Sequence, residues 1–351
     1  MSPAGLEVPA PRPLPSHASR RGVVLVNVGT PQAPTVEAVR AYLREFLGDP
    51  KVVDLPAPAR WLLLNLVILP FRPPRSAHAY QAIWTEAGSP LLVHSRAQAA
   101  ALSQRLPDAL VVLAMRYGKP SLRDAVAALS EAGVTDVTLV PLYPQDAAAT
   151  VGTTVEAFRA LVGEARVVAP FFSSPGFVGA VASKVRASVE SSGAEHVLFS
   201  YHGLPVRQVS ARCQATCSRR DGACPPLRDD NLRCYRAQCH ATTTAIAQAA
   251  GVLARSSTSF QSRLKGSSWI GPFTDEALAS LADRGVKRVA VACPSFVADC
   301  LETLEELGLR GAALFRAHGG AHLELVPAVN DAPAFIDTLA ELIRRKWEDA
   351  S

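Results

Sequence analysis

A pattern of apolar strands and helices that occurs twice is the feature that most constrains the fold of this chain. Residues 131–144 (EAGVTDVTLVPLYP) and 283–296 (DRGVKRVAVACPSF) share one plan, in which a helix ends at glycine and a short turn leads into a buried strand and a proline-containing loop. The apolar run at 22–30 likewise has a counterpart at 197–201. Two such pairs in the same order predict two related domains.

Within the first half, apolar strands alternate with amphipathic helices. Strands are predicted at 22–30, 110–115 and 137–142, and helices at 35–46 and 122–131. This alternation is typical of βαβ units, whose parallel sheet is covered by helices on both faces. The predicted fold class is therefore α/β, with two Rossmann-like, doubly wound domains and a cleft between them.

The chain of 351 residues is long enough for two domains of ordinary size. Turn-forming residues at 170–175 (PFFSSP) place the boundary between them. A last amphipathic helix is predicted near the C-terminus, capped by Asn330 or Asp331. The predicted parts are a flexible N-terminal tail at 1–20, an N-terminal domain at 21–170, a C-terminal domain at 171–333 and a C-terminal helix at 334–351.

Composition and charge limit the class of protein. Of the residues, 48% are hydrophobic and 19% are charged, which favours a compact globular protein over a disordered one. The formal net charge of +5 is too small to indicate nucleic-acid binding, and no block of lysine or arginine stands out. Residues 1–20 lack the apolar core of a secretion signal, so a cytoplasmic protein is expected.

The stretch that comes closest to a membrane-spanning helix is 61–71 (WLLLNLVILPF), which arginines flank on both sides. It is shorter than the roughly 18 apolar residues that a spanning helix needs. Two interpretations stay open for it. It is either a buried core helix ended by Pro70, or an apolar lip over 60–75 that dips into a membrane surface with its arginines at the headgroups.

Polar residues suited to chemistry follow the predicted strands. Asn27 lies at the end of the first strand and Tyr143 after a later one, whereas His202, Asp299 and Glu302 follow strands of the second half. The carboxyl ends of parallel strands share one edge of a sheet, where open α/β folds bind their ligands. A histidine with two carboxylates at such an edge suits proton transfer or transient binding of a metal.

The same residues also have purely structural interpretations. His202 is compatible with a hydrogen-bonded core histidine, and Glu302 with an acid in the first turn of a helix, where the macrodipole favours negative charge. The position of His202 before Gly203 and near an acidic pair favours a functional role.

Five of the seven cysteines lie between residues 212 and 239. Without a secretion signal, metal binding is favoured over disulfides, because thiols stay reduced in the cytosol. The spacing does not form two C-x-x-C pairs, which argues against a zinc ribbon, and four thiolates from an irregular loop suit an iron–sulfur cluster. An iron–sulfur cluster, a zinc site and free thiols therefore stay open for Cys213, Cys217, Cys224, Cys234 and Cys239.

Between residues 22 and 336 the chain resembles a known family through a series of motifs. Eight of them occur in the order found in that family: LVNVGTP (25–31), YLREFLGDPKVVDLP (42–56), IWTEAGSPLL (83–92), MRYGKPS (115–121), PLYPQ (141–145), SYHGLP (200–205), WIGPFTDE (269–276) and DCLETLEEL (299–307). By these motifs the chain resembles the ferrochelatases, the enzymes that insert ferrous iron into a porphyrin as the last step of haem synthesis.

The resemblance implies a chelatase-like fold of two Rossmann-like domains with the porphyrin between them. It implies His202 as the catalytic histidine, which takes protons from the pyrrole nitrogens or delivers iron. Glu302 is implied as the acid across the macrocycle, with Asp299 a weaker candidate for the same chemistry. Ferrous iron is then a substrate that contacts His202 and Glu302. Residues expected to contact the porphyrin are Tyr143, Arg116, Trp269 and Asn27.

The resemblance also implies a [2Fe-2S] cluster held by four of the five cysteines, as in members with an internal cysteine-rich segment at the position of residues 212–239. It favours the membrane-contacting lip at 60–75. The expected partners are therefore porphyrin, ferrous iron and a membrane surface, without nucleic acid, and a homodimer is one of the states that the sequence allows. The expected location is the cytoplasm, peripheral on the inner face of the cell membrane.

The favoured porphyrin is protoporphyrin IX, because the lip is apolar. One alternative is a chelatase for another tetrapyrrole or metal, such as coproporphyrin, sirohydrochlorin or cobalt. The other is a non-catalytic iron–sulfur or haem sensor. The presence of both His202 and Glu302 argues against a sensor, because a binding module needs no base.

Overall fold

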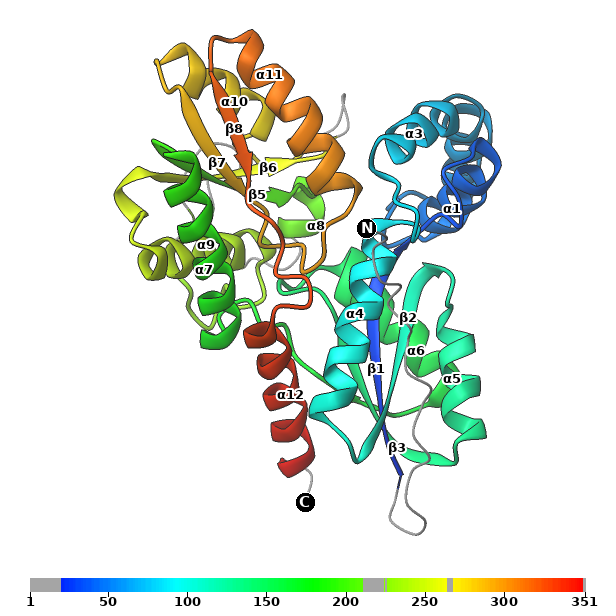
Figure 1. The fold of residues 1–351 in the computed structure, drawn as a ribbon. Coiled ribbons are helices and arrows are strands. Elements are labelled where there is room, and N and C mark those ends of the chain that lie inside the picture. Colours follow the sequence, from blue (N-terminus) through cyan, green and yellow to red (C-terminus); the bar gives the residue numbers. More distant parts are fainter. Residues whose placement is uncertain (1–19, 211–223, 225, 264–267, 350–351) are drawn as a thin grey trace, which may run out of the picture.

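The structure is a computed structural model that describes residues 20–210, 224, 226–263 and 268–349 (Figure 1). The tail predicted at 1–20 lies outside the described residues except for its last residue. Cys213 and Cys217 of the predicted cluster also lie outside them.

The described strands form two four-stranded sheets, with the orders β2-β1-β3-β4 and β6-β5-β7-β8. All neighbouring strands are parallel. The strands of the first sheet are β1 (Arg20–Thr30), β2 (Ala109–Gly118), β3 (Val134–Pro141) and β4 (Arg166–Val167). Those of the second sheet are β5 (His196–His202), β6 (Ser256–Gln261), β7 (Arg288–Ala292) and β8 (His322–Leu325).

Helices connect and cover these strands. In the first half they are α1 (Val36–Gly48), α2 (Ala57–Leu62), the π-helix η1 (Leu63–Ile68), α3 (Leu69–Ile83), α4 (Pro90–Arg105), α5 (Leu122–Glu131), the π-helix η2 (Ala148–Gly152) and α6 (Thr153–Val162). In the second half they are α7 (Pro175–Ser192), α8 (Val206–Ser210), α9 (Tyr235–Ala250), the 3₁₀-helix η3 (Leu253–Arg255), α10 (Thr274–Asp283), the π-helix η4 (Glu302–Gly311), α11 (Ala312–Ala317) and α12 (Pro333–Glu348).

The two sheets repeat one topology, which confirms the predicted pair of Rossmann-like units. β1 lies between β2 and β3, with Val24 in register with Val112 and Leu139. β5 lies between β6 and β7 in the same way, with Leu198 in register with Ser257 and Val291. The division of the chain at 170–175 stays a prediction.

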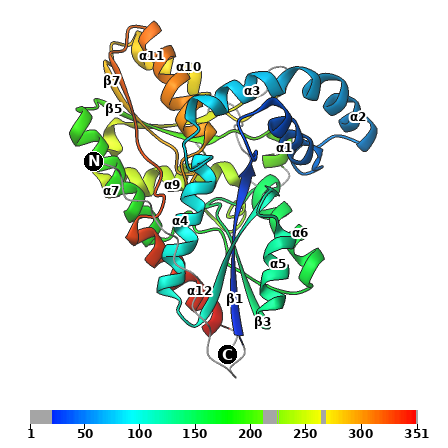
Figure 2. The ribbon, with the colours of Figure 1, turned by 45° about the vertical axis from the view of Figure 1, so that its right-hand side comes forward.

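The middle of β1 is a continuous apolar run because helices cover both faces of its sheet. Val23, Val24, Leu25 and Val26 are fully buried. Figure 2 shows α4 and α12 on one side of the first sheet and α5 and α6 on the other. Side chains of successive residues in β1 point to opposite faces of the sheet and therefore pack into two different cores. One core lies against α4 and the second half of the chain, and the other lies against α5 and α6.

The cap predicted for the last helix was wrong. α12 begins after Ala332, with Pro333 in its first turn, where a missing backbone N–H costs nothing. Asn330 instead adopts a left-handed backbone conformation, with φ of 47°. Its side chain bonds Asp299, so a contact with a distant loop takes precedence over capping.

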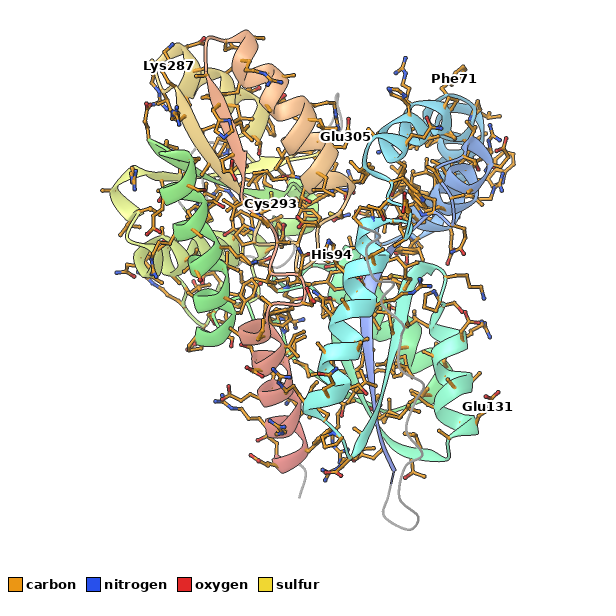
Figure 3. The ribbon with its side chains drawn as sticks, in the orientation of Figure 1. Phe71, His94, Glu131, Lys287, Cys293 and Glu305 are labelled. Atoms are coloured by element: carbon orange, nitrogen blue, oxygen red, sulfur yellow. The ribbon has the colours of Figure 1, made fainter. Side chains whose placement is uncertain are left out.

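The interpretation of 61–71 as a buried helix ended by Pro70 was also wrong. Helix α2, η1 and α3 follow one another without a break, and Pro70 lies in the first turn of α3. The exposed fraction is 60% for Trp61 and 72% for Phe71, which lies at the outer edge of this half in Figure 3. In the described residues, no helix has both the length and the apolarity to cross a membrane.

Candidate active site

His202 is the last residue of β5, at the carboxyl end of the second sheet. Its Nδ1 lies 2.7 Å from the carbonyl oxygen of Gly203, and its backbone carbonyl accepts a hydrogen bond from the Tyr235 hydroxyl at 2.7 Å. A carbonyl can only accept, so Nδ1 carries the proton. In the neutral ring Nε2 is then left with a free lone pair, as a general base requires.

The glycine after His202 is required by close packing. A Cβ at Gly203 would lie 2.7 Å from the carbonyl oxygen of Gln261 and 3.1 Å from the Trp269 ring. The Gly203 N–H donates to that same carbonyl at 2.8 Å. Trp269 is buried against this turn, so it supports the histidine loop by packing.

The acids of the second half lie on the π-helix η4. Glu302 begins this helix and Glu306 follows one turn later. Burial raises the pKa of Glu306, and the charge of Glu302 raises it further; a hydrogen bond from Ser262 and the charge of His202 oppose this shift. The two carboxylates and His202 therefore lie within electrostatic reach of one another. The sequence did not single out Glu306, whose i+4 spacing from Glu302 was the available signal.

Glu302 also faces the first half of the molecule. Burial raises the pKa of Tyr42 and of Tyr80 well above the ordinary value, and the charge of Glu302 adds to both shifts. Helices α3 and η4 contact each other. The acid of the second domain therefore lies where the two halves meet, beside two tyrosines that sequence reasoning missed.

Arg116 belongs to a hydrogen-bonded group at the end of β2. Its Nη2 donates to Asp49 Oδ2 at 2.6 Å and to Thr153 Oγ1 at 2.8 Å. The guanidinium also lies over the Tyr117 ring, 4.4 Å from its centroid. Tyr143 is buried, which raises its pKa, and the charge of Arg116 reaches it. Two of the four predicted porphyrin-contacting residues thus lie near each other in the first half.

Two further predicted site residues, Asn27 and Asp299, use their side chains in hydrogen bonds with other residues of the chain. The Asn27 amide donates to Ser95 Oγ at 3.1 Å and accepts from the Val28 N–H at 2.8 Å. The Asp299 carboxylate is buried and accepts from Asn330 Nδ2 at 2.8 Å and from Thr303 Oγ1 at 3.2 Å. These bonds give Asp299 a structural role in the loop that leads into η4.

A model of the ferrochelatase family matches residues 20–347. The chain belongs to the ferrochelatase family. It is 41% identical to a ferrochelatase of Coxiella burnetii (strain CbuG_Q212), over 93% of this chain and 94% of that protein. It is 40% identical to a ferrochelatase of Legionella pneumophila (strain Lens), over 93% of this chain and all of that protein.

Two solved structures are similar in shape at lower sequence identity. CbiX, described as the terminal enzyme for biosynthesis of sirohaem in denitrifying bacteria, has a TM-score of 0.49 and 17% identity, with 92% of this chain and 98% of that chain covered. SirB from Bacillus subtilis with Fe³⁺ has a TM-score of 0.48 and 14% identity, with 74% and 92% covered.

In this member of the ferrochelatase family, three of the five clustered cysteines lie in the described residues. Cys234 and Cys239 are buried and Cys224 is partly buried. Burial raises the pKa of the Cys239 thiol, and the neighbouring charges of Cys234 and Cys224 raise it further, so the three lie near one another. Within the described part of the chain, no three His, Cys, Asp or Glu side chains form a metal site.

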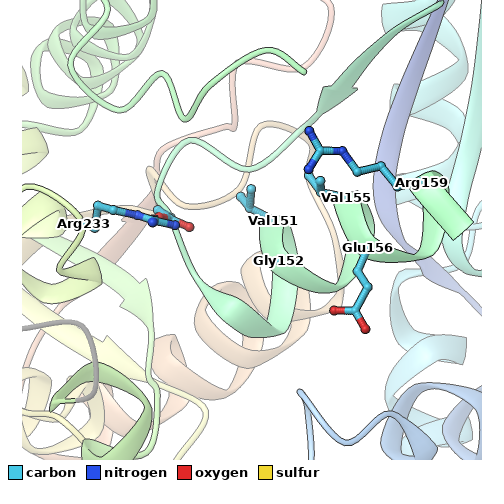
Figure 4. A pocket seen from close by; sticks show the side chains of 7 residues that line it. Val151, Gly152, Val155, Glu156, Arg159 and Arg233 are labelled. Carbon is cyan, nitrogen blue, oxygen red and sulfur yellow. The ribbon is translucent and has the colours of Figure 1, made fainter. Parts of the chain in front are cut away.

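A pocket of about 360 Å³ lies around the start of α6 (Figure 4). Val151 and Val155 form its apolar part, and Glu156, Arg159 and Arg233 supply charges. Neither His202 nor Glu302 lines it, so it is not the site predicted at the strand ends.

Proposed function

We propose that this chain inserts ferrous iron into a porphyrin in the synthesis of haem. Its membership of the ferrochelatase family over residues 20–347 supports this reaction. The observation that carries the site assignment is the group formed by His202, Glu302 and Glu306. His202, whose Nδ1 lies against the Gly203 carbonyl, lies within electrostatic reach of two acids where the two halves of the molecule meet.

Iron insertion requires the removal of two pyrrole N–H protons. The lone pairs of the pyrrole nitrogens also lie in the plane of the ring, so a base and a distorting pocket are both needed. His202 accepts these protons at Nε2, while its Nδ1–H stays on the Gly203 carbonyl and fixes the ring. Glu302 and Glu306 accept the protons in turn along η4 and leave His202 ready for the second transfer.

Ferrous iron is the second substrate. Carboxylate oxygen is a suitable ligand for this ion. Glu302 contacts it in the proposed site before the four pyrrole nitrogens take over, and the Nε2 lone pair of His202 is left for the protons. Asp299 supports the loop in front of η4 through its bonds to Asn330 and Thr303 and makes only an indirect contribution.

The first half supplies the residues that hold the porphyrin. Arg116 provides a cation whose bonds to Asp49 and Thr153 restrict its motion, and Tyr143 provides a buried aromatic ring. Asn27 supports this half by bonding Ser95, whereas Trp269 belongs to the second half and packs on Gly203.

The exposed apolar side chains of 60–75 form a lip that we assign to contact with the surface of a membrane. Trp61, Leu66 and Phe71 are exposed on it, and arginines flank the segment. Amphipathic surfaces of this kind bury their apolar side in the headgroup boundary. An enzyme bound to a membrane surface suits an apolar porphyrin, so the lip supports protoporphyrin IX as the substrate. It also supports a location at the inner face of the cell membrane. A homodimer stays a prediction from the sequence.

A [2Fe-2S] cluster in the cysteine-rich segment is a further part of the proposal. Arg236 is 1% exposed, and its Nη1 lies 3.2 Å from Cys224 Sγ. A buried guanidinium beside gathered thiols suits the negative charge of a thiolate-bound cluster. Cys234 and Cys239 are both buried, but Cys234 stands at the N-terminus of α9, where the helix dipole favours a thiolate, and Cys239 lies within the helix.

When bound, the cluster supplies a one-electron redox centre. Cys224 and Cys234 are the ligands we expect in the described residues, and Cys213 and Cys217 complete the set from outside them. Protein purified without air is expected to absorb between about 320 and 600 nm. Cys234→Ala should abolish this absorption and Cys239→Ala should keep it, whereas the reverse pattern would exchange their roles.

An anaerobic assay with Fe²⁺ and protoporphyrin IX tests the reaction and the role of His202. The wild-type chain should form haem, and His202→Ala should lower kcat by roughly 10² to 10⁴-fold, the range that a general base contributes. Porphyrin fluorescence quenching should show unchanged binding, and circular dichroism an unchanged fold. His318→Ala, an exposed histidine on the far side of the second domain, is the matched control.

The other outcomes identify the alternatives. Near-normal turnover by His202→Ala would remove the histidine from the mechanism. Tight porphyrin binding without any metalloporphyrin product in the wild type would indicate a sensor. Product only from coproporphyrin or sirohydrochlorin, or only with Co²⁺, would indicate a chelatase of different specificity.

A further inference from the structure

The carboxyl end of β6 touches both groups of the proposed site. Gln261 is the last residue of β6 and lies in register with His202 on β5. Ser262 follows it and contacts η4. Two consecutive residues therefore connect the strand that carries the histidine with the helix that carries the acids.

Ser262 binds the Glu306 carboxylate with two donors. Its backbone N–H donates to Oε1 at 3.0 Å, and its hydroxyl donates to Oε2 at 2.8 Å. Because each carboxylate oxygen has its own donor, both the position and the rotation of the carboxylate are fixed.

The backbone of Ser262 is in the left-handed region, with φ of 64°. A residue with a Cβ seldom adopts this conformation, and such residues persist where the surroundings over-determine them, often at functional sites. Here the conformation turns both the N–H and the hydroxyl of one residue towards Glu306.

Gln261 connects the same point to the histidine. Its backbone carbonyl accepts from the Gly203 N–H at 2.8 Å, and its side-chain Nε2 donates to the Glu302 carbonyl at 3.1 Å. Its Oε1 also accepts from Ser200 Oγ at 2.6 Å. Gln261 is buried, so these bonds are shielded from water and hold the start of η4 against the end of β5.

We propose that Ser262 is a positioning residue for iron insertion, which fixes the Glu306 carboxylate one turn from Glu302 on η4, with Gln261 fixing η4 to the histidine strand. This inference rests on the proposed proton path through His202, Glu302 and Glu306. The other ionisable groups that act on Glu306 are Arg310 on η4 and Cys293 at the end of β7. Arg310 Nη2 lies 4.0 Å from Glu306 Oε2, so Ser262 makes the shorter contacts.

A double-mutant cycle tests whether Ser262 acts through Glu306. Ser262→Ala and Glu306→Gln should each lower kcat by about tenfold or more, with the KM for porphyrin within about twofold of wild type. In the Glu306→Gln background, Ser262→Ala should cause no further loss, because the carboxylate it positions is gone. Losses in kcat that multiply in the double variant would overturn the proposal. A raised KM with unchanged kcat in Ser262→Ala would also overturn it and would indicate that Ser262 contacts the porphyrin itself.

Two further variants separate the hydroxyl from the backbone conformation. Ser262→Gly keeps the left-handed backbone and its N–H bond, so it should lose less kcat than Ser262→Ala. Ser256→Ala, at the other end of β6, should leave kcat unchanged, because in the described part of the chain its hydroxyl bonds the nearby Leu253 carbonyl. Equal losses for the glycine and alanine variants would overturn the role of the backbone conformation.

Failure of this inference is distinguishable from failure of the proposed function. Wild-type kcat in both Ser262→Ala and Glu306→Gln, together with loss of turnover in His202→Ala, would reject the positioning role alone. Normal turnover in His202→Ala would reject the proton path on which the inference rests.

Discussion

Single residues in this molecule often have their roles set by segments far away in the chain. Asp49, at the end of α1, is an example. Its Oδ2 accepts hydrogen bonds from Arg116 Nη2 at 2.6 Å, Tyr117 Oη at 2.9 Å and Thr153 Oγ1 at 2.6 Å. Burial alone would raise the pKa of Asp49, but these bonds and the arginine charge hold it below its ordinary value. Asp49 thus fixes a residue that we assign to porphyrin binding.

The lowered pKa of Asp49 predicts a pH-dependent stability. A carboxyl group whose pKa is lower in the folded state stabilises it above its ordinary pKa, and this contribution is lost as the pH falls through the folded pKa. Asp49→Asn should therefore lower the free energy of unfolding by about 1–3 kcal/mol at pH 7. The difference should shrink as the pH falls below about 4.

Urea unfolding of wild type and Asp49→Asn between pH 7 and pH 3 measures this difference. Asp54→Asn is the matched control, because Asp54 is exposed and pairs with Arg207 at the surface. A difference for Asp49→Asn that stays constant down to pH 3 would contradict the prediction.

The positions of His202 and Glu302 near the carboxyl ends of strands were predictable at the residue scale, because apolar strands precede them and the family motifs SYHGLP and DCLETLEEL contain them, whereas their catalytic roles stay a proposal. Tyr42, Tyr80 and Ser262 were not predictable, because their positions beside the acids arise from packing between segments that are distant in sequence. No local pattern marks a residue whose role is a contact of this kind.

At the scale of elements, the strands and most helices were predictable because their apolar period matches the local geometry. The predicted helix at 122–131 coincides with α5, and the strand at 22–30 is contained in β1. The π-helical form of η4 was not predictable, since its apolar and acidic spacing reads equally well as an α-helix. On this helix, Glu302 and Glu306 influence each other electrostatically.

The lip at 60–75 predicts membrane binding that depends on its exposed side chains. Trp61→Ser with Phe71→Ser should weaken binding to vesicles with anionic lipids by about tenfold or more, because each side chain loses apolar area that the membrane would bury. Turnover of detergent-dispersed porphyrin should not change. Vesicle co-sedimentation measures the binding.

Leu253→Ser is the control for this experiment, because Leu253 is similarly exposed but lies in the second half. An equal loss of vesicle binding in the control and in the lip variant would show that the lip is not the contact surface.

At the scale of the whole molecule, buried polar contacts hold the two halves together. Gln98 on α4 is fully buried, and its Nε2 donates to the carbonyls of Val297 at 2.8 Å and Asn330 at 2.9 Å. One amide of the first half thus satisfies two acceptors in the loops around η4. The position of the acids relative to the first domain depends on this contact.

Gln98→Leu should lower the free energy of unfolding by about 1–3 kcal/mol, because the Asn330 carbonyl loses its donor, whereas the Val297 carbonyl keeps the Asn330 N–H. Gln81→Leu should change it by less than about 0.5 kcal/mol, since Gln81 makes one exposed bond to the Pro34 carbonyl. Urea unfolding measures both values, and equal losses would contradict a special role for Gln98.

Helix α12 belongs to the end of the chain, yet it packs against α4 of the first half and α7 of the second. Trp347 donates to Thr138 Oγ1 at 2.9 Å across 209 residues, and Arg105 pairs with Asp337. Domains fold largely in the order in which they leave the ribosome. The surface of the first domain that contacts α12 therefore stays uncovered until α12 has been synthesised. Only then does the nascent chain reach its final arrangement.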